Sequence, residues 1–76
     1  MWGKEGLMAY RLKIEVNDWI KAQRVLNSIA NKDGNLRIAF QTNKVYQMVY
    51  LVDFKGNIRM LLYRDKVFNR SYLYVY

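Results

Sequence analysis

The hydrophobic pattern of the chain changes period twice, and each change marks a different element. From Met8 to Val16 apolar and polar residues alternate, with Tyr10, Leu12 and Ile14 on the apolar side. Such a period of two is typical of a half-buried strand. The other side of this strand carries polar and charged residues, among them Arg11 and Lys13.

Between residues 18 and 32 the apolar residues recur at helical spacing, which predicts an amphipathic helix. Asn17 or Asp18 can cap its start by accepting a hydrogen bond from the first-turn amides. Gly34 can end it in the left-handed conformation. The apolar stripe consists of Trp19, Ala22, Leu26, Ile29 and Ala30, with Val25 at its edge.

After the helix the period returns to two, and two turn signals, Thr42-Asn43 and Gly56-Asn57, divide the segment. Gly56-Asn57 suits a two-residue type II′ turn, since glycine accepts positive φ at the first central position. If both loops have two residues, the register is fixed in a three-stranded antiparallel meander. The pairs at the turns are then Gln41 with Lys44 and Lys55 with Ile58.

This register separates the residues of the meander into two unlike faces. The first is aliphatic and consists of Leu36, Ile38, Phe40, Val45, Val49, Leu51, Ile58, Met60 and Leu62, interrupted by Gln47. The second consists of Arg37, Ala39, Gln41, Tyr46, Met48, Tyr50, Val52, Phe54, Arg59, Leu61 and Tyr63. We expect the helix to cover the aliphatic face. One helix cannot cover both faces, so the second face is a candidate contact surface.

The C-terminal segment is less regular. Residues 64 to 70 form either a loop or one helical turn, and residues 71 to 76 alternate as a last strand. Its three tyrosines either join the second face or seal a sheet edge or dimer seam. The expected fold class is α+β, in the order β-α-β-β-β(-β), with one helix packed on one face of an antiparallel sheet. We expect residues 1–6 to be a flexible leader and residues 7–76 to be one domain.

Composition narrows the class of protein. Hydrophobic residues make up 53% of the 76 residues, which excludes a disordered tail and predicts a small folded domain. The chain has no cysteine and no apolar run of membrane-spanning length, so we expect a cytoplasmic protein without membrane contact. It also has no histidine, and its six carboxylates are scattered singly. We therefore expect no catalytic site, no metal site and no cofactor.

Charge suggests the partner. Thirteen Lys and Arg residues stand against six Asp and Glu, giving a formal net charge of +7, which favours polyanions. Tyrosine rings stack on unpaired bases while Arg and Lys neutralise phosphates. The candidate contact residues are Arg11, Lys13, Arg37, Tyr46, Tyr50, Arg59 and Tyr63. A secondary basic face on the helix consists of Lys21, Arg24 and Lys32.

Several functions stay open at this point. The first hypothesis is a non-enzymatic binding protein for nucleic acid, RNA more than DNA. The same face also suits a protein interface, since Tyr, Met and Arg are enriched there, so a homodimer is expected as well. A third hypothesis is a small phage-type inhibitor or adaptor that docks on an acidic surface of a larger host enzyme or ribonucleoprotein. The fourth is a small metal-independent ribonuclease that uses Lys, Arg and Tyr to stabilise a scissile phosphate.

Overall fold

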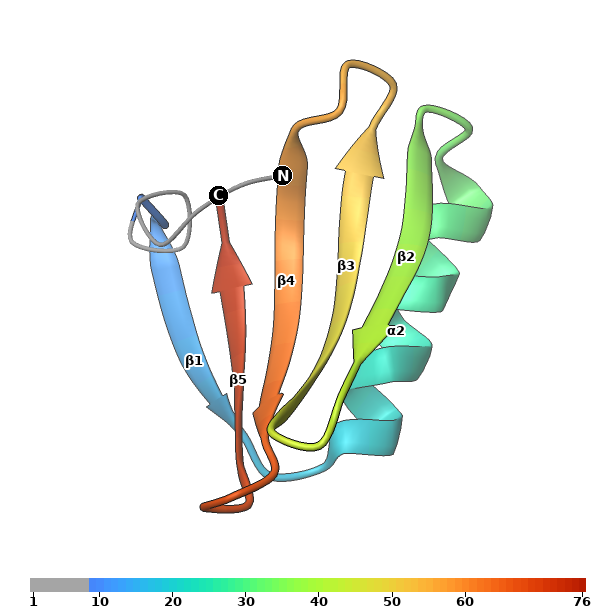
Figure 1. Ribbon diagram of the computed structural model, residues 1–76. Coiled ribbons are helices and arrows are strands. Elements are labelled where there is room, and N and C mark those ends of the chain that lie inside the picture. Colours follow the sequence, from blue (N-terminus) through green and yellow to red (C-terminus); the bar gives the residue numbers. More distant parts are fainter. Residues whose placement is uncertain (1–8) are drawn as a thin grey trace.

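One antiparallel sheet and one helix make up the protein, in a computed structural model that describes residues 9–76 (Figure 1). The elements along the chain are β1 (Leu12–Val16), α2 (Trp19–Lys32), β2 (Leu36–Thr42), β3 (Tyr46–Asp53), β4 (Ile58–Asp65) and β5 (Arg70–Val75). The strands lie in the order β1-β5-β4-β3-β2. The first strand of the chain therefore lies at one edge of the sheet and pairs with the last strand, β5. The predicted fold class is confirmed, including the last strand. The predicted leader and Met8 lie outside the described residues.

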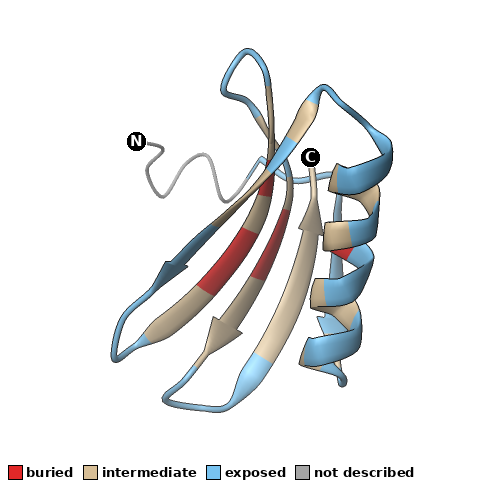
Figure 2. Cartoon of the chain, turned by 90° about the vertical axis from the view of Figure 1, so that its right-hand side faces the viewer, coloured by how far each residue is buried: buried red, intermediate tan, exposed pale blue. Residues whose placement is uncertain are grey.

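Helix α2 begins where the sequence predicts. Asp18 is the N-cap, and its carboxylate accepts a hydrogen bond from the backbone N–H of Lys21 at 3.0 Å. Leu26 is fully buried at the centre of the core, where it joins Val49 of β3 and Leu62 of β4. Figure 2 shows this arrangement, with the buried segments on the central strands and the inner side of the helix and an exposed outer helix surface. The predicted apolar stripe packs here: Trp19, Ala22, Leu26, Ile29 and Ala30.

The end of the helix differs from the prediction. Gly34 does not adopt positive φ, a conformation that glycine shows only at Gly56 within the described residues. Instead Asp33 ends the helix in an extended conformation, and its N–H donates to the carbonyl of Ile29. Its carboxylate accepts from the N–H of Asn35 at 2.9 Å. The Asp33 side chain therefore organises the turn that the prediction assigned to glycine.

Both predicted turns are too short, and both predicted registers are wrong. Gln41 lies opposite Met48 rather than Lys44, because Asn43 forms a longer loop in which its side chain accepts from the N–H groups of Val45 and Tyr46. In the next pair, Leu51 lies opposite Met60, where a two-residue turn would have placed Leu62. Before the bulge at Val52, each register error is an even number of residues. Since side chains alternate with a period of two, the face assignments survive wherever the pairing is regular.

The β3–β4 turn contains three residues and a left-handed glycine. Gly56 has φ +86, and its N–H donates to the carbonyl of Asp53 at 3.0 Å. Asp53 and Asn57 then close the hairpin, which is the pattern of a type I turn followed by a glycine bulge. A further bulge follows, since Val52 pairs with Ile58 and Leu51 with Met60. It places Ile58 opposite a residue of the second face, so the aliphatic assignment of Ile58 is wrong.

The helix leaves the apolar side of β1 uncovered. It packs chiefly over β2 and β3, at one side of the sheet, while β1 lies at the opposite edge (Figure 1). Leu12 and Ile14 of β1 face the same side as the helix but remain 49% and 44% exposed. Together with Leu73 of β5 and the exposed Val25 of α2, Ile14 lines an open apolar groove. The helix therefore covers most of the aliphatic face of the meander, as expected, but it leaves the apolar side of β1 uncovered.

Candidate functional site: the tyrosine face

The strand pairings bring five tyrosines onto the sheet face opposite the helix. Rows run across the strands, and the central one places Ala39, Tyr50, Leu61, Tyr74 and Lys13 side by side. We call this surface the tyrosine face. Its members are Lys13, Glu15, Arg37, Ala39, Gln41, Tyr46, Met48, Tyr50, Val52, Leu61, Tyr63, Asp65, Arg70, Tyr72 and Tyr74.

The tyrosine face has its own apolar centre. Leu61 is fully buried and Met48 is 7% exposed, although both lie on the side away from the helix. Leu61 is flanked directly by Tyr50 and Tyr74, and Met48 by Tyr63. The half-buried tyrosine rings thus lie beside these two buried side chains.

The rings also contact one another. Tyr46 and Tyr63 are stacked, with ring centroids 6.0 Å apart and an interplanar angle of 24°. The Tyr46 hydroxyl accepts a hydrogen bond from the side-chain amide of Gln41 at 3.1 Å. At the other end of the face, Tyr10 packs edge-to-face on Tyr74 with centroids 5.1 Å apart. The sequence had placed Tyr10 on the core side with Leu12, which is wrong because the regular strand begins only after it.

Two phenols are held in their protonated form. Burial raises the pKa of Tyr63 above its ordinary value, with further contributions from Asp65, Tyr74 and Tyr46. Burial likewise raises the pKa of Tyr76, and Tyr74 and Tyr10 add to the effect. At neutral pH these phenols are therefore hydrogen-bond donors and stacking surfaces rather than bases.

Three cations accompany the rings. The ammonium of Lys13 lies 4.5 Å from the ring centroid of Tyr72 and 5.6 Å from that of Tyr74, close enough for cation–π attraction. Arg37 lies opposite Val52 on β2 and is exposed. Arg70 lies opposite Asp65, at the end of the face where Tyr46 is found. Positive charge thus borders the rings on more than one side.

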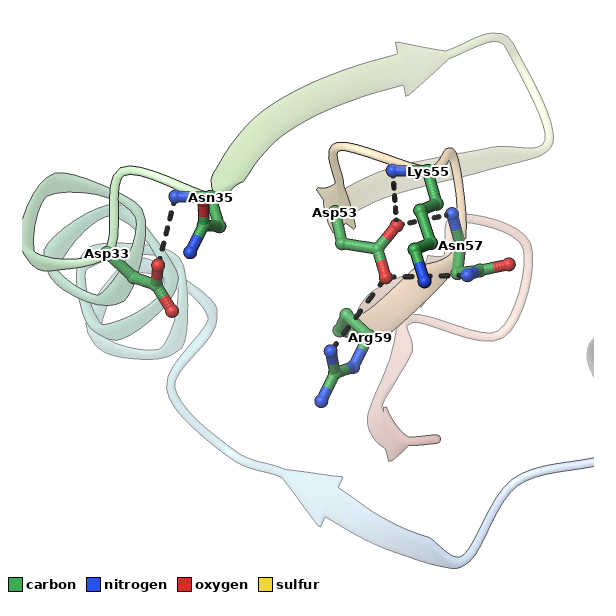
Figure 3. A network of polar contacts seen from close by, with 6 residues as sticks. All are labelled: Asp33, Asn35, Asp53, Lys55, Asn57 and Arg59. Atoms are coloured by element: carbon green, nitrogen blue, oxygen red, sulfur yellow. Dashed lines mark hydrogen bonds and ion pairs between the residues drawn. The ribbon is translucent and has the colours of Figure 1, made fainter.

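Two predicted contact residues lie outside the paired rows of the tyrosine face. Arg59 sits at the β4 bulge, where its guanidinium lies 3.8 Å from the carboxylate of Asp53 (Figure 3). Asp53 pairs with Leu36, a residue of the helix side, so the Arg59 side chain turns toward the hairpin loop. Arg11 precedes β1 and is exposed, and its backbone N–H donates to the carbonyl of Val75 at 2.7 Å. The regular pairing of β1 with β5 begins only at Leu12.

Some of the contact residues predicted from the sequence lie on the tyrosine face, and others do not. Lys13, Arg37, Tyr46, Tyr50 and Tyr63 come together on the tyrosine face. The sequence-based list omitted Tyr72, Tyr74 and Arg70, because the register of the last strand was unknown. The alternation of residues 70 to 75 could have identified these three residues, but only once β5 is known to lie between β4 and β1. The secondary basic residues Lys21, Arg24 and Lys32 are exposed on α2, on the other side of the sheet.

Across residues 9–76, no group of three or more His, Cys, Asp or Glu side chains is arranged to hold a metal ion. No helix in the same range is long and apolar enough to cross a membrane. Comparisons with family models, curated proteins and solved structures found no match for this chain.

Proposed function

We propose that this protein is a non-enzymatic binding protein for single-stranded nucleic acid, RNA before DNA, and that the tyrosine face is its binding surface. The observation that carries the proposal is the gathering of tyrosines on one side of the sheet, bordered by Lys13, Arg37 and Arg70. Flat rings on a sheet surface can stack on bases that are splayed out of a helix, as single-stranded RNA allows.

Energetics support a few stacked bases as the main source of affinity. Base–aromatic stacking contributes about 1–3 kcal/mol per base, and it tolerates any base because every base has a π face. Arg37 and Lys13 would neutralise phosphates between the stacked bases, and the net charge of +7 would attract the strand from a distance. The protonated phenols add hydrogen-bond donors that can meet base edges or a ribose hydroxyl.

Aromatic removal tests the surface directly. We expect Tyr63→Leu, which keeps an apolar side chain over Met48, to weaken binding of a fluorescently labelled single-stranded RNA at least about fivefold in anisotropy titrations. The matched control is Phe40→Leu, because Phe40 is an exposed aromatic on the helix side of the sheet. Equal affinities for the two variants would contradict the proposal.

Removal of single positive charges tests where the nucleic acid lies on the protein. Arg37→Gln and Arg24→Gln lower the net charge equally, but only Arg37 lies on the tyrosine face. We expect Arg37→Gln to weaken binding and to lower the slope of log K against log salt by about 0.7, the value for one phosphate contact on a single strand. We expect little change for Arg24→Gln. The reverse result would move the binding surface to the secondary basic face.

A protein partner is the second candidate, and the buried apolar centre of the face favours it. Met48 and Leu61 under a layer of tyrosines resemble the centre of a protein interface, where Tyr, Met and Arg are enriched. In this alternative the protein is a small inhibitor or adaptor whose face docks on an acidic surface. Failure to bind any single-stranded oligonucleotide at low salt, with a Tyr63-dependent protein complex instead, would favour it.

A further inference from the structure

Strand β1 leaves one edge of the sheet open. It pairs with β5 on its inner side, and within residues 9–76 no strand pairs with its outer side. An edge strand presents unpaired backbone N–H and C=O groups, which form a template for another strand. The groups next to this template determine which strand fits.

The apolar side of β1 is incompletely covered. Leu12 and Ile14 remain 49% and 44% exposed, since α2 lies over the other half of the sheet. Figure 1 shows β1 at the edge of the sheet that lies away from α2. A strand added at this edge would bury part of the Leu12 and Ile14 side chains.

The charged side of β1 is self-complementary. Lys13 and Glu15 flank Ile14 on the tyrosine face, and neither has an ion-pair partner among the described residues. An antiparallel pairing of two β1 strands centred on Ile14 places Lys13 of each copy opposite Glu15 of the other. Directly opposed opposite charges stabilise a strand pair, whereas like charges destabilise it.

The opposite edge of the sheet lacks this property. Strand β2 carries one charged residue, Arg37, so a two-fold pairing there brings no opposite charge to face it. A strand protected against association would also carry like charges, as edge lysines do in many sheets. The Lys-Ile-Glu order of β1 instead favours its own antiparallel copy.

We infer that the protein forms a two-fold homodimer by antiparallel pairing of the β1 edges, centred on Ile14. The pairs are Leu12 with Val16, Lys13 with Glu15 and Ile14 with Ile14 of the second copy. Five residues per strand make a small interface, so the dimer is weak and depends on concentration. The pairing joins both sheets and places the two tyrosine faces side by side, but it does not depend on nucleic-acid binding.

A disulfide reports the register of this pairing, because the chain has no cysteine of its own. Directly opposed residues of an antiparallel pair have Cα atoms about 4.5–5.5 Å apart, within the reach of a disulfide. Ile14→Cys should therefore form a covalent dimer under mild oxidation. In Leu12→Cys the two cysteines lie about 13 Å apart along the strands, so this similarly exposed control should form no covalent dimer.

Charge exchange tests the same pairing without cross-linking. Lys13→Glu should weaken the dimer at least about tenfold in sedimentation equilibrium, although it lowers the net charge and thus the general repulsion between copies. Glu15→Lys should weaken it as well. The double exchange Lys13→Glu with Glu15→Lys has the native net charge and should restore the native dissociation constant. Circular dichroism shows whether each variant is folded.

Three results would overturn the inference. The first is a monomer at every concentration, with no Ile14→Cys cross-link. The second is equal cross-linking of Ile14→Cys and Leu12→Cys, which would indicate random collision. The third is a dimer that ignores Lys13→Glu but is lost in Tyr63→Leu, which would show that the copies stack through their tyrosine faces. None of these results depends on RNA, so they are distinct from failure of the proposed function.

Discussion

At the scale of single residues, carboxylates organise the loops that hold the strands in register. Asp53 accepts hydrogen bonds from the backbone N–H groups of Lys55 and Asn57, at 3.0 and 2.9 Å (Figure 3). Asp65 does the same for Val67 and Phe68 in the β4–β5 loop. The bond from Asn57 is the main cause that lowers the pKa of Asp53, aided by Lys55 and Arg59 and opposed by burial. Asp53 therefore stabilises the fold in its ionised form.

The lowered pKa of Asp53 predicts how stability depends on pH. A carboxyl group with a lowered folded pKa stabilises the fold above its unfolded pKa, about 3.9, and loses this contribution as pH falls through the folded value. We expect Asp53→Asn to be less stable than the native protein in urea unfolding at neutral pH. The difference between the two should shrink below about pH 4, because Asp53 is then protonated too. A difference that stays constant down to acid pH would contradict this role.

At the scale of elements, the sequence could predict strands, helix and faces but not turn lengths. A register error of an even number of residues leaves each side chain on the same face. The predicted faces are therefore correct for Tyr46, Tyr50 and Tyr63, although the predicted pairings are wrong. Arg59 lies at a bulge, outside the paired rows, and a bulge leaves no clear sign in a single sequence. Coverage by α2 depends on where the helix lies across the sheet, which periodicity does not encode.

The two turn glycines provide a test of the loop structures. We expect Gly56→Ala to lower the free energy of unfolding by about 1–2 kcal/mol, because its positive φ is unfavourable for a residue with a Cβ atom. Gly34→Ala should leave stability unchanged or raise it by up to about 1 kcal/mol. At neither glycine would the added Cβ meet another atom within 4 Å, so the backbone conformation alone decides. Destabilisation by Gly34→Ala in urea unfolding would favour a left-handed helix end instead.

Helix packing predicts a second contrast between neighbouring residues. Leu26 is fully buried against the sheet, and we expect Leu26→Ala to destabilise the fold by about 2–5 kcal/mol through the lost contacts and the cavity. Val25 is 48% exposed at the groove, so Val25→Ala should cost much less. Chemical unfolding followed by the circular dichroism of each variant measures both. Similar losses at the two positions would mean that the helix is rotated about its axis.

At the scale of the whole molecule, two sides of one sheet have separate roles. The helix side forms the core with Leu26, Val49, Leu51 and Leu62, and its uncovered part continues to the open edge at β1. The tyrosine side forms a second, thinner apolar layer over Met48 and Leu61. Sequence periodicity could predict that two unlike faces exist. It could not show that β1 is an edge strand within residues 9–76, since strand order in space is not encoded in alternation.

We predict that single-stranded RNA binds across the tyrosine face, and an NMR titration with a short oligonucleotide locates the bound surface. With isotope labels on the tyrosine rings and on the methyl groups of Ile20 and Val25, both sides of the protein are observed in one sample. We predict large shifts or broadening of the ring signals of Tyr46, Tyr50, Tyr63, Tyr72 and Tyr74, and little change at the two exposed helix residues. Shifts confined to the helix methyl groups, or unchanged tyrosine signals at saturating RNA, would contradict the account.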